Sequence, residues 1–406
     1  MAPGVYISYP FCAQKCTFCN FASGVFSREL EHAYLDALVR EMEAHVWTEP
    51  PDTVYLGGGT PSRMPVSDLQ RVLAAIPGRP WREATIEAAP GTITAEAAAG
   101  WRELGLTRVS LGVQSFAAAE LARTGRRHTA EVVARDVDLL RGAGIGNFNI
   151  DLIAGLPGQT AASWSASLDC VERLRAPHAS VYMFEVDEDS RLGREVLFHG
   201  VRYGAPDVPG DDAIAALYET AVERLAACGL ARYEISNFAR PGCESAHNLK
   251  YWRLEPYFGF GADAHSFDGV WRWQNAESAQ EYVLLSSQPA TICCGAGSQP
   301  AAASQAALLP VCGSAALWGI PPACVGLSAP PVPGLSRVPA NLAEERFFVG
   351  LRLLEGIQPA PEEWSRHDAA ISRFQRDGLL VRDGPRLRLT SRGVLLSNEV
   401  FEEFIH

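Results

Sequence analysis

The chain is 406 residues long, with 47% hydrophobic and 20% charged residues and a net charge of −12 at pH 7. This length allows a large core and a second, smaller domain. The composition argues against a membrane-spanning protein, because no apolar run is long enough to cross a bilayer, and the opening MAPGVYISYP does not read as a signal peptide. The acidic balance disfavours nucleic acid as a partner. We therefore expect a soluble, cytoplasmic protein.

A loop with three cysteines directly follows the first apolar, strand-like run at residues 5–9. Cys12, Cys16 and Cys19 form a C-x-x-x-C-x-x-C pattern. Thiolates are ligands of iron-sulfur clusters, and a tight loop with these gaps can aim three sulfurs at one cluster. Three ligands on a four-iron cluster leave one iron open to a small molecule. A zinc knuckle would need a fourth Cys or His at loop spacing, which the next residues, NFAS, do not supply; the other alternative is a chance group of buried cysteines.

Strand and helix patterns alternate along the first half of the chain. Strands are predicted at residues 5–9, 53–56 and 84–88, and from residues 108, 148 and 179. Helices are predicted at residues 27–46, from a capping box at Ser67 and Gln70, from Thr94 to Gly105, from Thr129 to about residue 142, and at 164–174. Alternation of this kind indicates right-handed crossovers and a parallel sheet. Six such units predict an α/β barrel that is left open on one side.

Unusual polar or glycine-rich segments lie at the C-terminal ends of the predicted strands, where function gathers in parallel barrels. They are the cysteine loop, residues 57–61, Glu87, Gln114, Asp151 and Glu185. The three glycines at 57–59 let the backbone approach a ligand closely and present its N–H groups. Tight turns use the same residues, and a buried carboxylate at a strand end is often a satisfied structural group. Taken alone, these residues leave both interpretations open.

The cysteine pattern, with an aromatic residue before the third cysteine, resembles the signature of the radical S-adenosylmethionine (SAM) superfamily. There the amino and carboxylate groups of SAM chelate the open iron of a 4Fe-4S cluster. The resemblance implies a partial (β/α)6 barrel with Cys12, Cys16 and Cys19 as metal ligands. It also implies cofactor contacts from Tyr6, Phe18, Gly58, Gly59, Thr60, Glu87, Gln114, Arg126 and Asp151. Relatives often read E-x-N-P where this chain has E-A-A-P from Glu87, so any role of that Asn side chain is missing.

A second region, residues 211–285, follows the predicted barrel at residues 1–210. After an amphipathic helix at 211–228 come the segments RYEISNFA, HNLKYW and YFGFGADAHSF. They resemble the coproporphyrinogen III oxidase-like family and, within it, the HemW-type heme chaperones. The resemblance covers nearly the whole chain apart from residues 286–339. Its H-N-x-x-Y-W motif, which is associated with heme binding in those chaperones, is complete here as His247, Asn248, Tyr251 and Trp252.

His247 is the heme ligand that this resemblance implies. Imidazole is a common axial ligand of heme iron, and aromatic neighbours can cover the macrocycle. A histidine beside aromatic residues is otherwise a hydrogen-bonded core residue, and we assign His265 a structural or supporting role of that kind. The oxygen-independent oxidase of the family carries a further Cys two residues after its third cluster cysteine, where this chain has Phe21.

The remainder of the chain divides into an insert and a final module. Residues 286–339 are rich in Ala, Ser, Pro and Gly and have the composition of a disordered insert. No two of its four cysteines have the C-x-x-C spacing, so we expect these cysteines to be dispensable for iron binding. Residues 340–406 predict a helix at 341–354, a helix at 362–375, a hairpin that turns at 383–384 and a last helix to residue 405. This order resembles a winged-helix module, which we interpret as a lid or a partner surface.

Three functions are compatible with these patterns. The leading one is a heme chaperone that binds heme and transfers it to acceptor apoproteins, with a 4Fe-4S cluster, SAM and an electron donor for the cluster. The alternative is an oxygen-independent coproporphyrinogen III oxidase, which decarboxylates its substrate by radical SAM chemistry in heme biosynthesis. A radical enzyme that modifies RNA or protein is the third, and the acidic balance and the porphyrin-family segments count against it. Transient contact with a membrane surface is compatible with all three.

Overall fold

The computed structural model describes residues 1–287 and 337–405. At the centre of this part of the chain lies a sheet with the strand order β12-β11-β10-β9-β1-β2-β3-β4-β5-β6-β8-β7. Strands β1 to β6 pair in parallel in sequence order. They are β1 Gly4–Tyr9, β2 Thr53–Gly58, β3 Glu83–Ala88, β4 Arg108–Gln114, β5 Asn147–Ala154 and β6 His178–Met183. The six predicted parallel strands are confirmed.

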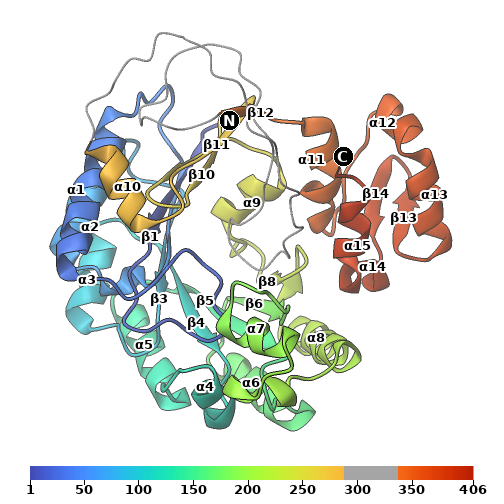
Figure 1. Cartoon of the computed structure of the whole chain (residues 1–406), viewed down its shortest axis with the longest axis horizontal. Coiled ribbons are helices and arrows are strands. Elements are labelled where there is room, and N and C mark those ends of the chain that lie inside the picture. The colour runs from blue at the N-terminus through green and yellow to red at the C-terminus, as the bar shows by residue number, and fades with distance from the viewer. Residues whose placement is uncertain (288–336, 406) are drawn as a thin grey trace.

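Helices connect the parallel strands and surround the outer side of the sheet (Figure 1). They are α1 Arg28–Ala44, α2 Val66–Ala74, α3 Ala95–Glu103, α4 Ala118–Arg123, α5 Ala130–Gly142 and α6 Ala161–Arg173. After β6 come α7 Arg191–Leu197 and α8 Asp211–Ala227, which packs on α6. Thr94, Thr129 and Thr160 cap α3, α5 and α6 by accepting a backbone N–H. The apolar faces of these helices and strands share one core, in which Trp101 and Trp164 are fully buried.

Residues 211–285, together with residues 338–339, add strands to both ends of the same sheet. Beyond β6 lie β8 Asn237–Ala239 and β7 Ala231–Arg232. Beyond β1 lies β9 Tyr257–Phe260, which is parallel to β1, followed by β10 His265–Phe267, β11 Trp271–Gln274 and β12 Val338–Pro339. Two helices, α9 Ala246–Trp252 and α10 Ala279–Ser286, complete this region. The region therefore extends the central sheet instead of forming a sheet of its own.

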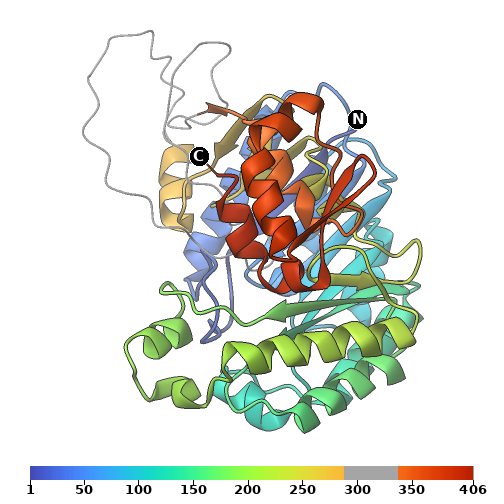
Figure 2. The same ribbon diagram turned by 90° about the vertical axis from the view of Figure 1, so that its right-hand side faces the viewer.

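The C-terminal module has its own two-stranded sheet and lies beside the central sheet in Figure 1, so that it stands in front of the sheet in Figure 2. Its elements are α11 Leu342–Phe348, α12 Pro361–Arg366, α13 Asp368–Arg376, β13 Leu380–Asp383, β14 Arg386–Leu389, α14 Ser391–Leu395 and α15 Ser397–Glu402. The predicted hairpin is confirmed. The two predicted long helices are wrong, because the first ends at Phe348 and the second is divided at His367. His367 is buried, with ring centroids 4.5 Å from Phe347 and 5.3 Å from Phe404.

Two further differences from the sequence predictions are local. Helix α2 begins at Val66 with Pro65 as its N-cap, and no side chain caps it. Ser67 therefore lies inside the first turn, and the predicted capping box is wrong. Helix α4 occupies a stretch where no helix was predicted. Most of the predicted insert, with its four cysteines, lies outside the described residues, and its predicted end falls in β12.

None of the helices in residues 1–287 and 337–405 is long and apolar enough to cross a membrane.

Candidate functional site

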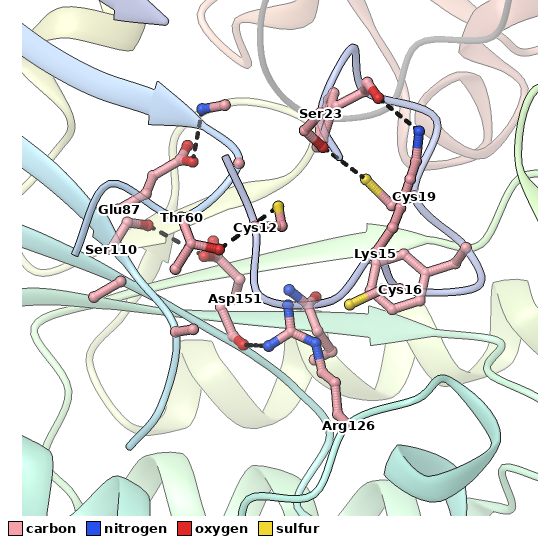
Figure 3. A pocket seen from close by; sticks show the side chains of 18 of the residues that line it. Cys12, Lys15, Cys16, Cys19, Ser23, Thr60, Glu87, Ser110, Arg126 and Asp151 are labelled. Carbon is pink, nitrogen blue, oxygen red and sulfur yellow. Dashed lines mark hydrogen bonds between the residues drawn. The ribbon is translucent and has the colours of Figure 1, made fainter. Parts of the chain in front are cut away.

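A cavity of about 550 Å³ lies at the carboxyl ends of the parallel strands. Its wall combines the cysteine loop after β1, the glycine loop after β2, the ends of β3 to β6, and α9 (Figure 3). The predicted site residues that line it are Tyr6, Cys12, Cys16, Phe18, Cys19, Gly58, Gly59, Thr60, Glu87, Gln114, Arg126, Asp151, Asn248 and Tyr251. Residues far apart in the sequence thus meet at one place. His247 and Trp252 do not line the cavity.

The cysteine loop presents its three thiols to one space. All three cysteines line the cavity, and Figure 3 shows their sulfurs distributed along the loop. The Thr60 hydroxyl donates to Sγ of Cys12 at 3.7 Å, and Sγ of Cys19 lies 3.8 Å from Oγ of Ser23. Burial raises the pKa of the Cys19 thiol. These neighbours fix the direction of two of the three sulfurs.

The glycine run holds the cysteine loop against β2. The N–H of Gly59 donates to the carbonyl of Tyr9 at 2.7 Å, and the N–H of Thr60 donates to the carbonyl of Phe11 at 3.0 Å. A Cβ on Gly59 would lie 2.8 Å from the backbone of Phe11, so a larger residue would push the two loops apart. The prediction that the N–H groups of the three glycines are presented to a ligand is therefore wrong for Gly59.

Two partly buried carboxyl groups, Glu87 and Asp151, lie on the cavity wall. Glu87 accepts hydrogen bonds from the Tyr55 hydroxyl at 2.9 Å and from the N–H of Gly58 at 3.2 Å, so that N–H is also engaged. Burial, and next the charge of Asp151, raise the pKa of Glu87 to about 8. Burial also raises the pKa of Asp151, against hydrogen bonds such as that from Ser110 at 3.2 Å. At neutral pH Glu87 is therefore largely protonated and lies beside a second acidic side chain, Asp151. Perturbed acidic groups of this kind are typical of functional sites.

Arg126 and Gln114 form the wall beside β4. Arg126 donates through Nη1 to the carbonyl of Gly112, while its Nε is buried and has no hydrogen-bond partner. Gln114 has a φ of 69°, and the pairing of β4 with β5 shifts register beside it. Irregular strand ends of this kind redirect side chains next to functional sites. An unpaired, buried guanidinium N–H is costly unless a ligand supplies an acceptor, so Arg126 suits an anionic group.

His247 lies on α9, directly behind the cavity wall, and is fully buried. Its Nδ1 lies 3.0 Å from Oγ1 of Thr53, and its Nε2 lies 2.8 Å from the hydroxyl of Tyr251. Its ring stacks on Tyr55 with centroids 5.3 Å apart. Burial lowers the pKa of His247 to about 3, so the imidazole is neutral. Both ring nitrogens are engaged, and heme ligation by His247 would require one of these contacts to break.

Trp252 lies on the other side of α9 and contacts the C-terminal module. The guanidinium carbon of Arg352 lies 4.4 Å from the centre of a Trp252 ring. His265 lies on β10, outside the cavity lining, and burial lowers its pKa to about 4. The residues of the motif H-N-x-x-Y-W therefore lie in two different environments: Asn248 and Tyr251 line the cavity, and Trp252 contacts the C-terminal module.

Thr53 and Tyr55, the two β2 residues that bond to His247 and Glu87, are not among the predicted site residues. For the run TVYL the sequence predicts only a buried strand. Alternate residues of a strand face the same side, and Thr53 and Tyr55 alternate with the apolar Val54 and Leu56. That alternation of polar-tipped and aliphatic side chains was the available signal.

Comparisons with known proteins identify the family of the chain. The model of the radical SAM superfamily matches residues 6–171, and the model of the HemN C-terminal domain matches residues 339–396. The heme chaperone HemW of Bacillus subtilis is 30% identical and covers 98% of both chains. This chain belongs to the radical SAM superfamily and, within it, to the HemW family. The HemW of Mycobacterium tuberculosis is 33% identical, over 98% of this chain and 93% of its own.

This chain shares its fold with a solved oxidase. The coproporphyrinogen III oxidase HemN from Escherichia coli aligns with a TM-score of 0.75, over 99% of this chain and 90% of that one, at 20% identity. At this identity the likeness concerns the fold: the α/β sheet together with the C-terminal domain.

The residues of this HemW family member fit the cluster and cofactor of its superfamily. Thiolates are suitable donors for iron, and all three cysteines of the loop line the cavity. No three His, Cys, Asp or Glu side chains in residues 1–287 and 337–405 are grouped closely enough to hold a single metal ion. In a four-iron cluster, by contrast, each thiolate binds a different iron. The unpaired Nε of Arg126 in the cavity wall suits the carboxylate of SAM.

Proposed function

We propose that the protein is a heme chaperone, which binds heme and passes it to acceptor apoproteins, and that it carries a 4Fe-4S cluster with SAM at the open iron. The observation that carries the proposal is that the cysteine loop and two members of the heme-associated motif, Asn248 and Tyr251, line one cavity. Membership of the HemW family supports it, since relatives matched over nearly their whole length are named heme chaperones.

In this proposal Cys12, Cys16 and Cys19 hold the cluster. When bound, the cluster would supply an open iron for the amino and carboxylate groups of SAM to chelate, and one electron, which an external electron donor would replace. Arg126 binds the carboxylate of SAM through its free Nε, and Glu87, held by Tyr55 and Gly58, contributes a hydrogen-bonding group. The other proposed cofactor contacts are Tyr6, Phe18, Gly58, Gly59, Thr60, Gln114 and Asp151.

Heme contact is proposed for His247, Asn248, Tyr251 and Trp252. A histidine that binds a metal usually donates its other ring N–H to a neighbouring acceptor. Thr53 is such an acceptor, 3.0 Å from Nδ1 of His247. Because the imidazole is neutral, Nε2 can offer a lone pair to iron once its contact with Tyr251 is released.

We assign the C-terminal module the role of a lid. The amide of Asn398, on α15, donates to Oε1 of Glu185 at 3.4 Å, and Glu185 lines the cavity. The module therefore reaches the cavity wall from outside the central sheet. A lid in this position would control the access of heme or of an acceptor protein.

The second candidate is coproporphyrinogen III oxidation, which the shared fold with HemN keeps open. The test is anaerobic reconstitution of iron and sulfide, followed by parallel assays of heme binding and of coproporphyrinogen turnover with SAM and a reductant. We expect stoichiometric heme binding and no protoporphyrinogen, because Phe21 occupies the position where the oxidase resemblance demands a Cys. Protoporphyrinogen formed above the level of a variant in which Cys12, Cys16 and Cys19 are replaced by Ala would instead establish the oxidase activity.

A further inference from the structure

His247 has a fixed side and a cavity side. On the fixed side its Nδ1 faces Thr53, and its backbone N–H donates to Oε1 of Glu83 at 3.0 Å, which anchors the start of α9. On the cavity side Nε2 contacts Tyr251, which lines the cavity although His247 does not. The two rings are nearly perpendicular, at 89°, with centroids 5.1 Å apart. An iron that approaches His247 from the cavity therefore meets Tyr251 first.

Nε2 of His247 can serve only one partner at a time. A neutral imidazole carries its proton on one nitrogen and a lone pair on the other. With the proton on Nδ1 and donated to Thr53, Nε2 accepts a hydrogen bond from the Tyr251 hydroxyl. The same tautomer is the one that ligates a metal. When an iron–nitrogen bond forms with this lone pair, the hydrogen bond from Tyr251 has to break, and no proton needs to leave the ring.

We propose that His247 and Tyr251 form an exchange switch that couples heme binding to SAM binding. While Nε2 holds the hydroxyl, Tyr251 completes the wall of the cofactor cavity. When Nε2 ligates heme iron, Tyr251 loses this partner and leaves its position. Heme and SAM then weaken each other's binding by the same factor. The inference depends on the proposed function, since it takes heme and SAM as the two ligands.

A second set of contacts links the switch to the cofactor side of the cavity. The ring of His247 stacks on Tyr55, and the hydroxyl of Tyr55 donates to Glu87 at 2.9 Å. Tyr55 in turn stacks on Tyr6, with centroids 6.1 Å apart. Tyr6 and Glu87 are both proposed SAM contacts, so a displacement at His247 reaches them through directly packed side chains.

The test measures SAM affinity by isothermal titration calorimetry on the full, anaerobically reconstituted protein, with and without saturating hemin. The loss of about one hydrogen-bonded wall contact predicts that hemin raises the Kd for SAM about threefold to tenfold. In Tyr251→Phe, which keeps the ring and lacks the hydroxyl, hemin should no longer change the Kd. Tyr182→Phe is the matched control, because Tyr182 lines the same cavity from β6; there the dependence on hemin should persist.

The possible results separate the switch from the proposed function. If hemin binds and His247→Ala shifts its spectrum, but hemin leaves SAM affinity unchanged, the switch is wrong and the chaperone proposal stands. The switch is also contradicted if hemin still changes the Kd for SAM in Tyr251→Phe. It is equally contradicted if the heme spectrum is the same in His247→Ala as in the parent. A protein that binds no hemin overturns the proposed function itself.

Discussion

Nη2 of Arg352 lies 3.4 Å from Oε2 of Glu234, and both side chains are buried, with exposed fractions of 7% and 0%. Glu234 stands between β7 and β8, whereas Arg352 belongs to the turn after α11. A backbone bridge between Glu234 and Leu353 adjoins the pair. The C-terminal module is thus joined to the end of the central sheet by a buried charge pair, and the same guanidinium covers Trp252 of the heme-associated motif.

We expect Arg352→Met to lower the free energy of unfolding by about 3–5 kcal/mol, because it leaves the buried carboxylate of Glu234 without its ion-pair partner. The measurement is urea denaturation of the apoprotein followed by circular dichroism. Adding Glu234→Gln to Arg352→Met should recover a large part of the loss. Arg253→Met is the control: its pair with Glu355 is exposed and 3.7 Å long, so it should cost less than about 1 kcal/mol. An equal loss of unfolding free energy in Arg352→Met and Arg253→Met would argue against a stabilising buried ion pair between Arg352 and Glu234.

The cluster assignment predicts a difference between two sets of cysteines. Replacing Cys12, Cys16 and Cys19 together with Ala should abolish bound iron and the visible absorption of thiolate-ligated iron after reconstitution. The control replaces the other cysteines of the described chain, Cys170, Cys228 and Cys243, none of which lines the cavity. That variant should keep its iron. Iron analysis and absorption spectra are the measurements, and a full iron load in the first variant would refute the assignment.

Much of the fold was predictable from the sequence because parallel strands and their helices have strong local patterns. Each strand from β1 to β6 is a short segment that contains apolar β-branched or aromatic residues, and the threonines before α3 and α5 are visible N-caps. The division at His367 had no such signal, since no Gly or Pro marks it. It arises because His367 packs against Phe347 and Phe404, which are distant in the sequence.

The sequence predicts which residues belong to the site better than it predicts which of them are in contact. The strand-end positions of Glu87 and Asp151 indicated a shared edge, and both line the cavity. The partners of the glycine run could not be predicted, because the N–H of Gly59 bonds to a carbonyl of β1, and only the tertiary structure decides that pairing. Burial of His247 was equally hidden, since it depends on how α9 packs on β2.

The raised pKa of Glu87 predicts a pH-dependent stability of the apoprotein. Its pKa rises from 4.5 when unfolded to about 8 in the folded protein, mainly through burial. The folded state therefore keeps a proton that the unfolded state loses, and the free energy of unfolding should fall as pH rises from 4.5 to 8. One such group contributes at most about 1.4 kcal/mol per pH unit.

Glu87→Gln isolates this contribution. Gln stays neutral but cannot accept both hydrogen bonds that Glu87 receives, so we expect it to be less stable than the parent near pH 5 and to lose less stability between pH 5 and pH 8. Urea denaturation at several pH values measures the difference. Glu41→Gln is a comparison away from the cavity, since burial raises the pKa of Glu41 to about 7; its effect should level off about one pH unit lower. Parallel stability curves for Glu87→Gln and the parent would contradict the prediction.

The last prediction concerns the heme ligand. His247→Ala should shift the absorption spectrum of bound heme and weaken heme binding by at least about tenfold, because an iron–nitrogen bond is lost while apolar contacts remain. Iron content of the cluster should stay unchanged, since His247 contacts none of the three cluster cysteines. His265→Ala is the matched control, another largely buried histidine whose pKa burial also lowers, and it should keep the parent spectrum. If His265→Ala changes the heme spectrum and His247→Ala does not, the ligand lies on β10 instead of α9, and the H-N-x-x-Y-W motif acts through Tyr251 at the cavity wall.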